Sequence, residues 1–313
     1  MTHVSFVVIT YNEEENISDC IGSIHDLVAN SSVGNYEILV VDSNSTDKTV
    51  DRVISFDKVR VIKLPTGYES PAAGRYVGTE VSHGDVLVFV DGDMILQSGW
   101  LDDALAEMAP DDVAGVCGCL NEKDIYSVEE TAKIKGVMLY KKAVFDTRGG
   151  FDPFIRGGED YELSFRLNAE GYRTLKLPTV VATHQSKDKT VMEIPRRVRH
   201  GYYASLGQLL RKNVTRPGLA AEHIKRNLAN LVLPPIYVLL GVVFLQGSKI
   251  TKLSIIGAAT LALGYGTTKS GFHRTCYYFA SKPVKFICVV HGGLRSHPQI
   301  EHFPLHEVKI VDR

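Results

Sequence analysis

The sequence has few cysteines, and they do not form the pattern that a disulfide framework needs. Its 313 residues include five cysteines, an odd number, and only Cys117 and Cys119 lie close together. Cys-x-Cys is not a usual zinc or redox spacing. We therefore expect a reduced, cytosolic setting for this chain.

The chain also carries almost no net charge, and its first residues do not resemble an export signal. The formal net charge is −1, so no overall field attracts a polyanion, and we expect no nucleic-acid partner. Residues 1–10 lack the basic region and small-residue cleavage site of a signal peptide. No Gly-x-Gly-x-x-Gly follows the first apolar run, which argues against a dehydrogenase. Thr10 to Glu13 is acidic rather than glycine-rich and basic, which argues against a nucleotidyltransferase.

Short apolar runs alternate with amphipathic segments in the first half of the chain. This pattern predicts an α/β fold with a mainly parallel sheet. Runs rich in valine and isoleucine predict strands at residues 4–10, 37–41, 59–64 and 86–90. Further strands are expected at 113–118, 136–140, 175–177 and 180–184, with Pro178 separating the last two. Ligands of such sheets bind at the carboxyl ends of the strands.

Polar residues gather at these predicted strand ends. Asp91 and Asp93 follow the strand at 86–90 directly, with Gly92 between them. Two carboxylates at this spacing can face one divalent cation, and Mg²⁺ takes carboxylates together with phosphate oxygens. The cation would neutralise charge on a departing diphosphate. The alternative is a polar turn with solvated acids.

Four short motifs in the first 160 residues carry a resemblance to a known family. They are Val-Val-Ile-Thr-Tyr-Asn-Glu at 7–13, Val-Val-Asp-Ser-Asn-Ser-Thr-Asp at 40–47, Asp-Gly-Asp at 91–93 and Gly-Gly-Glu-Asp at 157–160. In order and spacing they resemble the family 2 glycosyltransferases of the GT-A fold. The resemblance covers about residues 4–184 and implies a nucleotide-sugar donor and a divalent cation, Mg²⁺ or Mn²⁺.

The resemblance also implies roles for individual residues. Those that would bind the donor nucleotide are Thr10, Tyr11, Asn12, Glu13, Asp42, Arg75 and Asp91. Asp93 would be the main metal ligand, with Asp91 beside it, and His184 would complete the metal site. A lone histidine can equally be a satisfied structural residue.

The Gly-Gly-Glu-Asp motif opens a predicted helix at residues 159–170. Acids at a helix N-terminus complement the macrodipole, which is the structural interpretation. The two preceding glycines permit close approach of another molecule. By resemblance, Asp160 is the general base that deprotonates the acceptor hydroxyl, and Gly158 and Glu159 lie on the acceptor side.

A basic stretch runs from Arg196 to Arg226 and has only one acid, Glu222. It suits anionic lipid headgroups or a diphosphate, and Arg196 and Arg197 could clamp a pyrophosphate. The solvated helix face is the alternative. The chain departs from processive relatives by lacking Gln-x-x-Arg-Trp here, which disfavours polymer synthesis. It also lacks the Asp-Ala-Asp-Leu-Gln run typical of polyprenyl-phosphate sugar synthases.

No apolar run reaches the roughly 20 residues of a straight membrane span. Residues 231–245 contain Pro234 and Pro235, and residues 253–265 are thinned by glycines and alanines. Extending the first run back to Leu228 gives a marginal span. Because the basic stretch precedes these runs and residues 277–290 have an interfacial character, we expect membrane association. A buried hairpin in a soluble domain is the alternative.

The sequence therefore predicts a GT-A domain at residues 1–216 and a C-terminal helical, membrane-associated segment at 217–313. Its predicted function is inverting transfer of a sugar from a nucleotide diphosphate to an acceptor hydroxyl, on a lipid-linked or surface glycan. The expected partners are the donor, the acceptor and membrane lipids, with the catalytic domain on the cytoplasmic side of the cell membrane. A non-catalytic nucleotide-sugar-binding or scaffold protein is the alternative.

Overall fold

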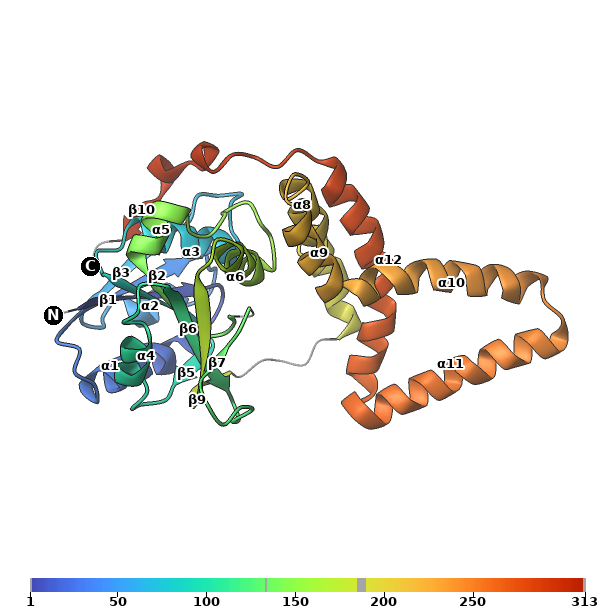
Figure 1. Cartoon of the computed structure of the whole chain (residues 1–313), viewed down its shortest axis with the longest axis horizontal. Helices are drawn as coiled ribbons and strands as arrows, with labels where there is room; N and C mark the ends of the chain where they lie inside the picture. The colour runs from blue at the N-terminus through green and yellow to red at the C-terminus, as the bar shows by residue number, and fades with distance from the viewer. Residues whose placement is uncertain (1, 133, 185–189, 312–313) are drawn as a thin grey trace. The chain divides into compact units, whose positions relative to one another are not determined.

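The chain folds into two compact units in the computed structural model, which describes residues 2–132, 134–184 and 190–311 (Figure 1). One unit comprises residues 1–186 and 298–313, and the other comprises 187–297. These units differ from the predicted division at residue 216. Helix α8 (Ser205–Lys212) packs on α12 (Phe272–Leu294) so closely that a side chain at Gly207 would collide with the α12 backbone. The last residues, in contrast, return to the sheet.

Parallel strands form the half of the sheet built from the start of the chain. In the order β3-β2-β1-β4 these strands are Val59–Lys63, Asn35–Asp42, His3–Thr10 and Val86–Asp91. All three ladders between them are parallel. Between them in the chain come the helices α1 (Ile17–Ala29), α2 (Thr49–Val53) and α3 (Pro71–Glu80). The predicted α/β class is confirmed.

The other half of the sheet is mixed. It contains β8 (Met138–Lys141), β6 (Val113–Leu120), β9 (Arg173–His184) and β5 (Met94–Leu96), while the two-residue β7 (Glu129–Glu130) pairs with β9. Strand β8 runs antiparallel to both β4 and β6, and β5 runs antiparallel to β9. The helices of this half are α4 (Leu101–Glu107), α5 (Lys142–Arg148) and α6 (Glu159–Ala169). Parallel pairing therefore does not extend across the sheet.

Strand β9 is continuous where the sequence predicted two strands divided at Pro178. Its ladder with β6 shifts register between Cys117 and Cys119, beside this proline. A bulge tolerates the missing proline N–H, because the residue there does not have to donate to the ladder. The strand can thus run on to His184.

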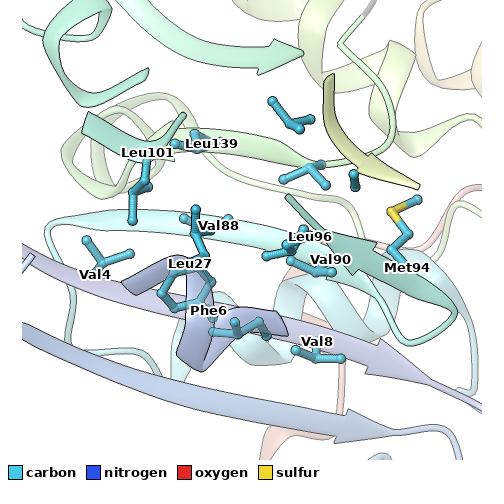
Figure 2. Packing of buried hydrophobic residues seen from close by; sticks show 14 of the residues in the cluster. Val4, Phe6, Val8, Leu27, Val88, Val90, Met94, Leu96, Leu101 and Leu139 are labelled. Atoms are coloured by element: carbon cyan, nitrogen blue, oxygen red, sulfur yellow. The ribbon is translucent and has the colours of Figure 1, made fainter. Parts of the chain in front are cut away.

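The core lies on both faces of the sheet. In β1, Val4, Phe6 and Val8 face one side and pack with Leu27 of α1 and Val88 of β4 (Figure 2). Alternate residues of the same strand, such as Val7, face the other side, as the two-residue period of a strand requires.

Helix α3 approaches β1 closely on that second side. A side chain at Gly78 would collide with Val7 Cγ1, and one at Gly74 would lie 2.8 Å from Ile9 Cγ2. The two glycines let the helix backbone rest directly on the strand. Arg75, between them in the sequence, is thereby carried toward the strand ends.

The C-terminal segment completes the α/β unit. Strand β10 (Lys309–Val311) pairs antiparallel with β3 at the sheet edge. Phe303 is buried, and its ring centroid lies 5.3 Å from those of both Tyr68 and Tyr76 and 6.1 Å from that of Phe154. This segment was predicted to belong to the membrane-associated part of the chain. Too few apolar residues mark it as core in the sequence.

Phe303→Ala should destabilise the α/β unit by about 3–5 kcal/mol, the usual cost of emptying a buried phenylalanine site. The chain has a single tryptophan, Trp100, which is fully buried in this unit, so its fluorescence during denaturant unfolding reports on this unit. Leu305→Ala is the control, because Leu305 lies in the same segment but is exposed. Equal unfolding midpoints for the two variants would contradict a packing role for the segment.

The second unit is helical. Besides α8 and α12 it contains η1 (Val191–Glu193), α7 (Ile194–Arg199), α9 (Pro217–Arg226), α10 (Leu228–Gln246) and α11 (Lys249–Ser270). In the described part of the chain, α10 is the one helix long and apolar enough to cross a membrane. It runs through Pro234 and Pro235 without ending, and Pro234 is its only buried residue. No residue of α11 is buried.

Candidate active site

The ends of three parallel strands bring the predicted polar residues together. The register of β1 and β2 places Thr10 opposite Asp42, and that of β1 and β4 places Ile9 opposite Asp91. Residues separated by many positions in the sequence therefore share one edge of the sheet. This is the edge at which α/β sheets bind ligands.

Two loops at this edge are joined by hydrogen bonds. Asn12 donates its backbone N–H to Ser45 Oγ at 2.9 Å and accepts from the Thr46 N–H at 2.8 Å. The Glu13 N–H donates to Thr49 Oγ1 at 2.8 Å. Asn12 has a positive φ of 55°, a conformation that asparagine tolerates better than most residues. Ser45 and Thr49 were not predicted as site residues, although the polar run after β2 marked their loop.

Asp42 and Thr10 lie beneath these loops. Asp42 is fully buried, and its Oδ2 accepts from the Ser45 N–H at 3.0 Å. Among the described residues, Asp42 Oδ1 and Thr10 Oγ1 are buried and have no hydrogen-bond partner. Buried polar atoms of this kind are uncommon. They suit a ligand that brings its own hydrogen-bonding groups.

Arg75 connects the end of β4 with the start of α6. Its guanidinium is buried, donates to Asp91 Oδ1 at 2.8 Å and also donates to Glu159 Oε1. Burial raises the pKa of Asp91, and the positive charge of Arg75 opposes that shift. The resemblance implies that Arg75 binds the donor, which stays a prediction; in the structure Arg75 bridges two acids from separate segments. It therefore fixes the distance between the strand end and the helix.

Asp93 and His184 meet across the β5–β9 ladder. Met94 is the register partner of His184, and His184 Nε2 lies 3.0 Å from Asp93 Oδ2. The hydrogen bond to Asp93 raises the pKa of His184 above its usual range. The His184 N–H donates to Asn121 Oδ1 at 2.7 Å, which fixes this end of β9.

This pair can hold a divalent cation only with help from a ligand. No group of three or more histidine, cysteine, aspartate or glutamate side chains forms a metal cluster in the described residues, and Asp91 is engaged by Arg75. Mg²⁺ is commonly bound by one or two carboxylates, with phosphate oxygens and water filling its other positions. The donor set therefore fits a cation that arrives with a diphosphate, and does not fit an all-protein cage.

The two acids at the start of α6 have different environments. Gly158 precedes them with a left-handed φ of 79°, which glycine adopts at little cost. Glu159 is 7% exposed and turns to Arg75, whereas Asp160 is half-buried and accepts from the Tyr161 N–H at 2.9 Å. Glu159 is thus held in an internal ion pair, while Asp160 is the more accessible carboxylate.

Arg196 and Arg197 belong to α7, in the helical unit. Arg196 is exposed, and Arg197 Nε donates to Glu193 Oε2 at 3.1 Å. Their contact with a pyrophosphate stays a prediction.

Acids at the ends of β2 and β4, an arginine bridge and an acidic helix start on a mixed α/β sheet are the arrangement expected of a GT-A glycosyltransferase. Residues 5–157 match a family model described as Glycosyl transferase family 2. The matched part, just under half of the chain, is similar to that family.

Relatives of known name agree with this assignment. The protein named Glycosyltransferase AglE of Haloferax volcanii is 26% identical over 208 residues, which cover 59% of this chain and 67% of that protein. A Methanococcus voltae enzyme, dolichyl N-acetyl-alpha-D-glucosaminyl phosphate 3-beta-D-2,3-diacetamido-2,3-dideoxy-beta-D-glucuronosyltransferase, is 22% identical over 245 residues, covering 68% and 75% of the two chains.

The fold is also seen in solved structures. The mannosyltransferase PcManGT from Pyrobaculum calidifontis, solved with GDP-Man and Mn²⁺, superposes with a TM-score of 0.67 at 22% identity. The match covers 91% of this chain and 86% of that one. At this identity the likeness establishes the GT-A fold.

Proposed function

We propose that this glycosyltransferase moves a sugar from a nucleotide diphosphate to an acceptor hydroxyl by one displacement that inverts the anomeric carbon. The observation that carries the proposal is the Arg75 bridge. It joins Asp91, at the donor end of β4, to Glu159, the immediate neighbour of Asp160. A carboxylate able to take the acceptor proton is thereby held beside the acids proposed to bind the donor.

Each group has one proposed task. The loops carrying Thr10, Tyr11, Asn12 and Glu13 bind the nucleoside, and Asp42 Oδ1 binds an edge of the base or ribose. Asp42 suits uridine, guanosine or thymidine donors. Asp160 removes the proton of the acceptor hydroxyl, which raises the nucleophilicity of that oxygen as the bond to the anomeric carbon forms.

A divalent cation is part of the proposal. Asp93 and His184 would hold it, since they lie within hydrogen-bond distance of each other, and the similar archaeal mannosyltransferase was solved with Mn²⁺. When bound, the cation neutralises charge on the departing diphosphate. Arg196 and Arg197 are proposed to contact a diphosphate, as the basic stretch in the sequence predicts.

We further propose a lipid-linked acceptor and a membrane location, with the catalytic unit on the cytoplasmic side. The name of the Methanococcus voltae relative specifies a dolichyl phosphate-linked sugar. In this chain, α10 spans 19 residues with almost no buried side chain, and α11 is exposed along its length. Lipid around α10 and α11 would cover this apolar surface. Partition of the intact chain between membranes and supernatant measures this part of the proposal.

Nucleotide release tests the activity. The intact chain is mixed with GDP- and UDP-sugars, Mn²⁺ and a polyprenyl-phosphate-linked sugar, and free nucleotide is measured over time. We expect acceptor-dependent release with one donor class and a product of inverted anomeric configuration. Donor binding in a thermal-shift assay without release under any condition would favour the non-catalytic alternative.

A further inference from the structure

A buried lysine lies between two helices of the helical unit. Lys282 of α12 is only 5% exposed. Its Nζ donates to Asn230 Oδ1, on α10, at 2.8 Å, and lies 3.9 Å from the ring centroid of Tyr278. In the described part of the chain no carboxylate forms an ion pair with it.

This ammonium is poorly compensated. Burying a charge without a charged partner is costly, because water solvation is lost and one neutral hydrogen bond with one ring contact offsets only part of it. Burial accordingly lowers the pKa of Lys282. Asn230 uses one of the three donors of the ammonium, which leaves two for another acceptor.

A second polar group nearby is also unsatisfied. Tyr237 lies on α10 two turns beyond Asn230, and its buried hydroxyl has no hydrogen-bond partner among the described residues. Tyr278 contacts Lys282 and is close enough to Tyr237 to interact with it electrostatically. Its ring covers the ammonium and is itself 43% exposed, so rotation of one side chain opens the group to the surroundings.

The position of this group along α10 indicates the kind of ligand. Asn230 is in the first turn of the apolar helix, and α10 and α12 meet there (Figure 1). In a helix that crosses a membrane, the first turn lies at headgroup depth, where lysine and tyrosine side chains gather. The anions at that depth are lipid phosphates.

We propose that Lys282, with Asn230, binds the phosphate of an anionic lipid, one whose charge is not balanced by a choline cation, at the start of α10. The proposal rests on the membrane association proposed above. An ammonium with two free donors forms strong charge-assisted hydrogen bonds to phosphate oxygens. Asn230 Nδ2 donates one N–H to Asn227 Oδ1 and has a second N–H for the same ligand. The phosphate provides the negative charge that the Lys282 ammonium does not find among the described residues.

Lys282→Met tests the proposal, because methionine matches the length of lysine, favours helix and carries no charge. We expect this variant to melt at the same temperature as the wild type or higher, since it removes a buried unpaired charge. Flotation with phosphatidylcholine vesicles containing phosphatidic acid should show about ten-fold weaker binding than the wild type, equivalent to one lost charge-assisted hydrogen bond.

The matched control is Lys269→Met, which removes the same charge from an exposed position of α11. The assay uses about 0.5 M salt, where screening over a few ångströms suppresses the contribution of exposed charges. Under these conditions Lys269→Met should bind like the wild type. Equal loss in both variants, or a melting temperature lowered several degrees only by Lys282→Met, would overturn the proposal in favour of a purely electrostatic or structural lysine.

Further measurements distinguish phosphate from solution from the phosphate of a lipid. They also distinguish failure of the phosphate site from failure of the proposed membrane association. Inorganic phosphate that stabilises the detergent-solubilised wild type, but not Lys282→Met, supports a site filled from solution. Stabilisation by short-chain phosphatidic acid alone supports a lipid phosphate. If the wild type floats equally well with and without phosphatidic acid, membrane association stands and the phosphate site is wrong. If it floats with neither vesicle, both are wrong, while nucleotide release still reports on catalysis.

Discussion

Asp160→Asn is expected to slow sugar transfer by about 10²–10⁴-fold, the usual loss when a general base is removed. Asparagine keeps the size of the side chain and can still accept a hydrogen bond from the Tyr161 N–H, as Asp160 does. It cannot take up the acceptor proton. Donor and cation affinity should change little, because the groups proposed to bind them are Asp42, Asp93 and His184. Donor affinity and single-turnover transfer are measured on the same variant. The affinity should stay near the wild-type value while transfer falls.

A matched control distinguishes a base from an acid that stabilises its helix. Asp103 lies in the first turn of α4 and is exposed, so Asp103→Asn removes the same charge from an equivalent helical position. An acid at a helix N-terminus contributes about 0.3–1 kcal/mol, and both variants should lose roughly that much stability. Only Asp160→Asn should lose transfer. Near-normal transfer by Asp160→Asn would reject the base, and parallel loss of donor binding would indicate misfolding or a nucleotide-binding role.

The part of the fold that the sequence predicted is the part with local signals. Each of β1, β2, β3 and β4 is a short apolar run bounded by polar residues, and such runs predict buried strands. Their shared edge followed from parallel pairing alone. The antiparallel position of β8 between β4 and β6 had no such signal, because a strand of four residues does not reveal its partners.

Long-range packing explains what the sequence could not show. Phe303 and β10 return to the sheet after the whole helical unit, and the contact depends on pairing between residues as distant as Lys63 and Lys309. Truncation before the apolar helices would therefore remove part of the α/β unit as well as the exposed helices. An experiment that separates the units has to keep residues 298–313.

The sequence predicted which acids belong to the candidate site, but it did not predict the bridging role of its arginine. Asp42, Asp91, Asp93 and Asp160 are marked by motifs at strand and helix ends. The bridging role of Arg75 depends on the rotamer of a buried side chain and on the packing of α3 against β1 through Gly74 and Gly78. Motif spacing does not encode that packing.

Asp93→Ala should abolish measurable transfer, with a loss of about 10³-fold or more, because a bound cation contributes several kcal/mol to a transition state that develops charge on a leaving group. The fold should survive, since Asp93 is only partly buried and His184 is its hydrogen-bond partner. Thermal shift should show that Mn²⁺ no longer strengthens donor binding. Asp124→Ala, which removes an exposed acid paired with Lys176, is the control and should keep both properties.

The same loss should appear, in weaker form, in His184→Ala, and the two substitutions together decide whether the residues act as one site. If Asp93 and His184 hold one cation, the double variant should be no worse than Asp93→Ala, because the cation is already lost. If His184 is only a structural partner of β9, the two effects on transfer should instead add. Transfer measured across a range of Mn²⁺ concentrations sharpens the comparison, since excess cation should partly restore His184→Ala and leave Asp93→Ala inactive. Additive losses that no concentration of Mn²⁺ relieves would remove His184 from the metal site.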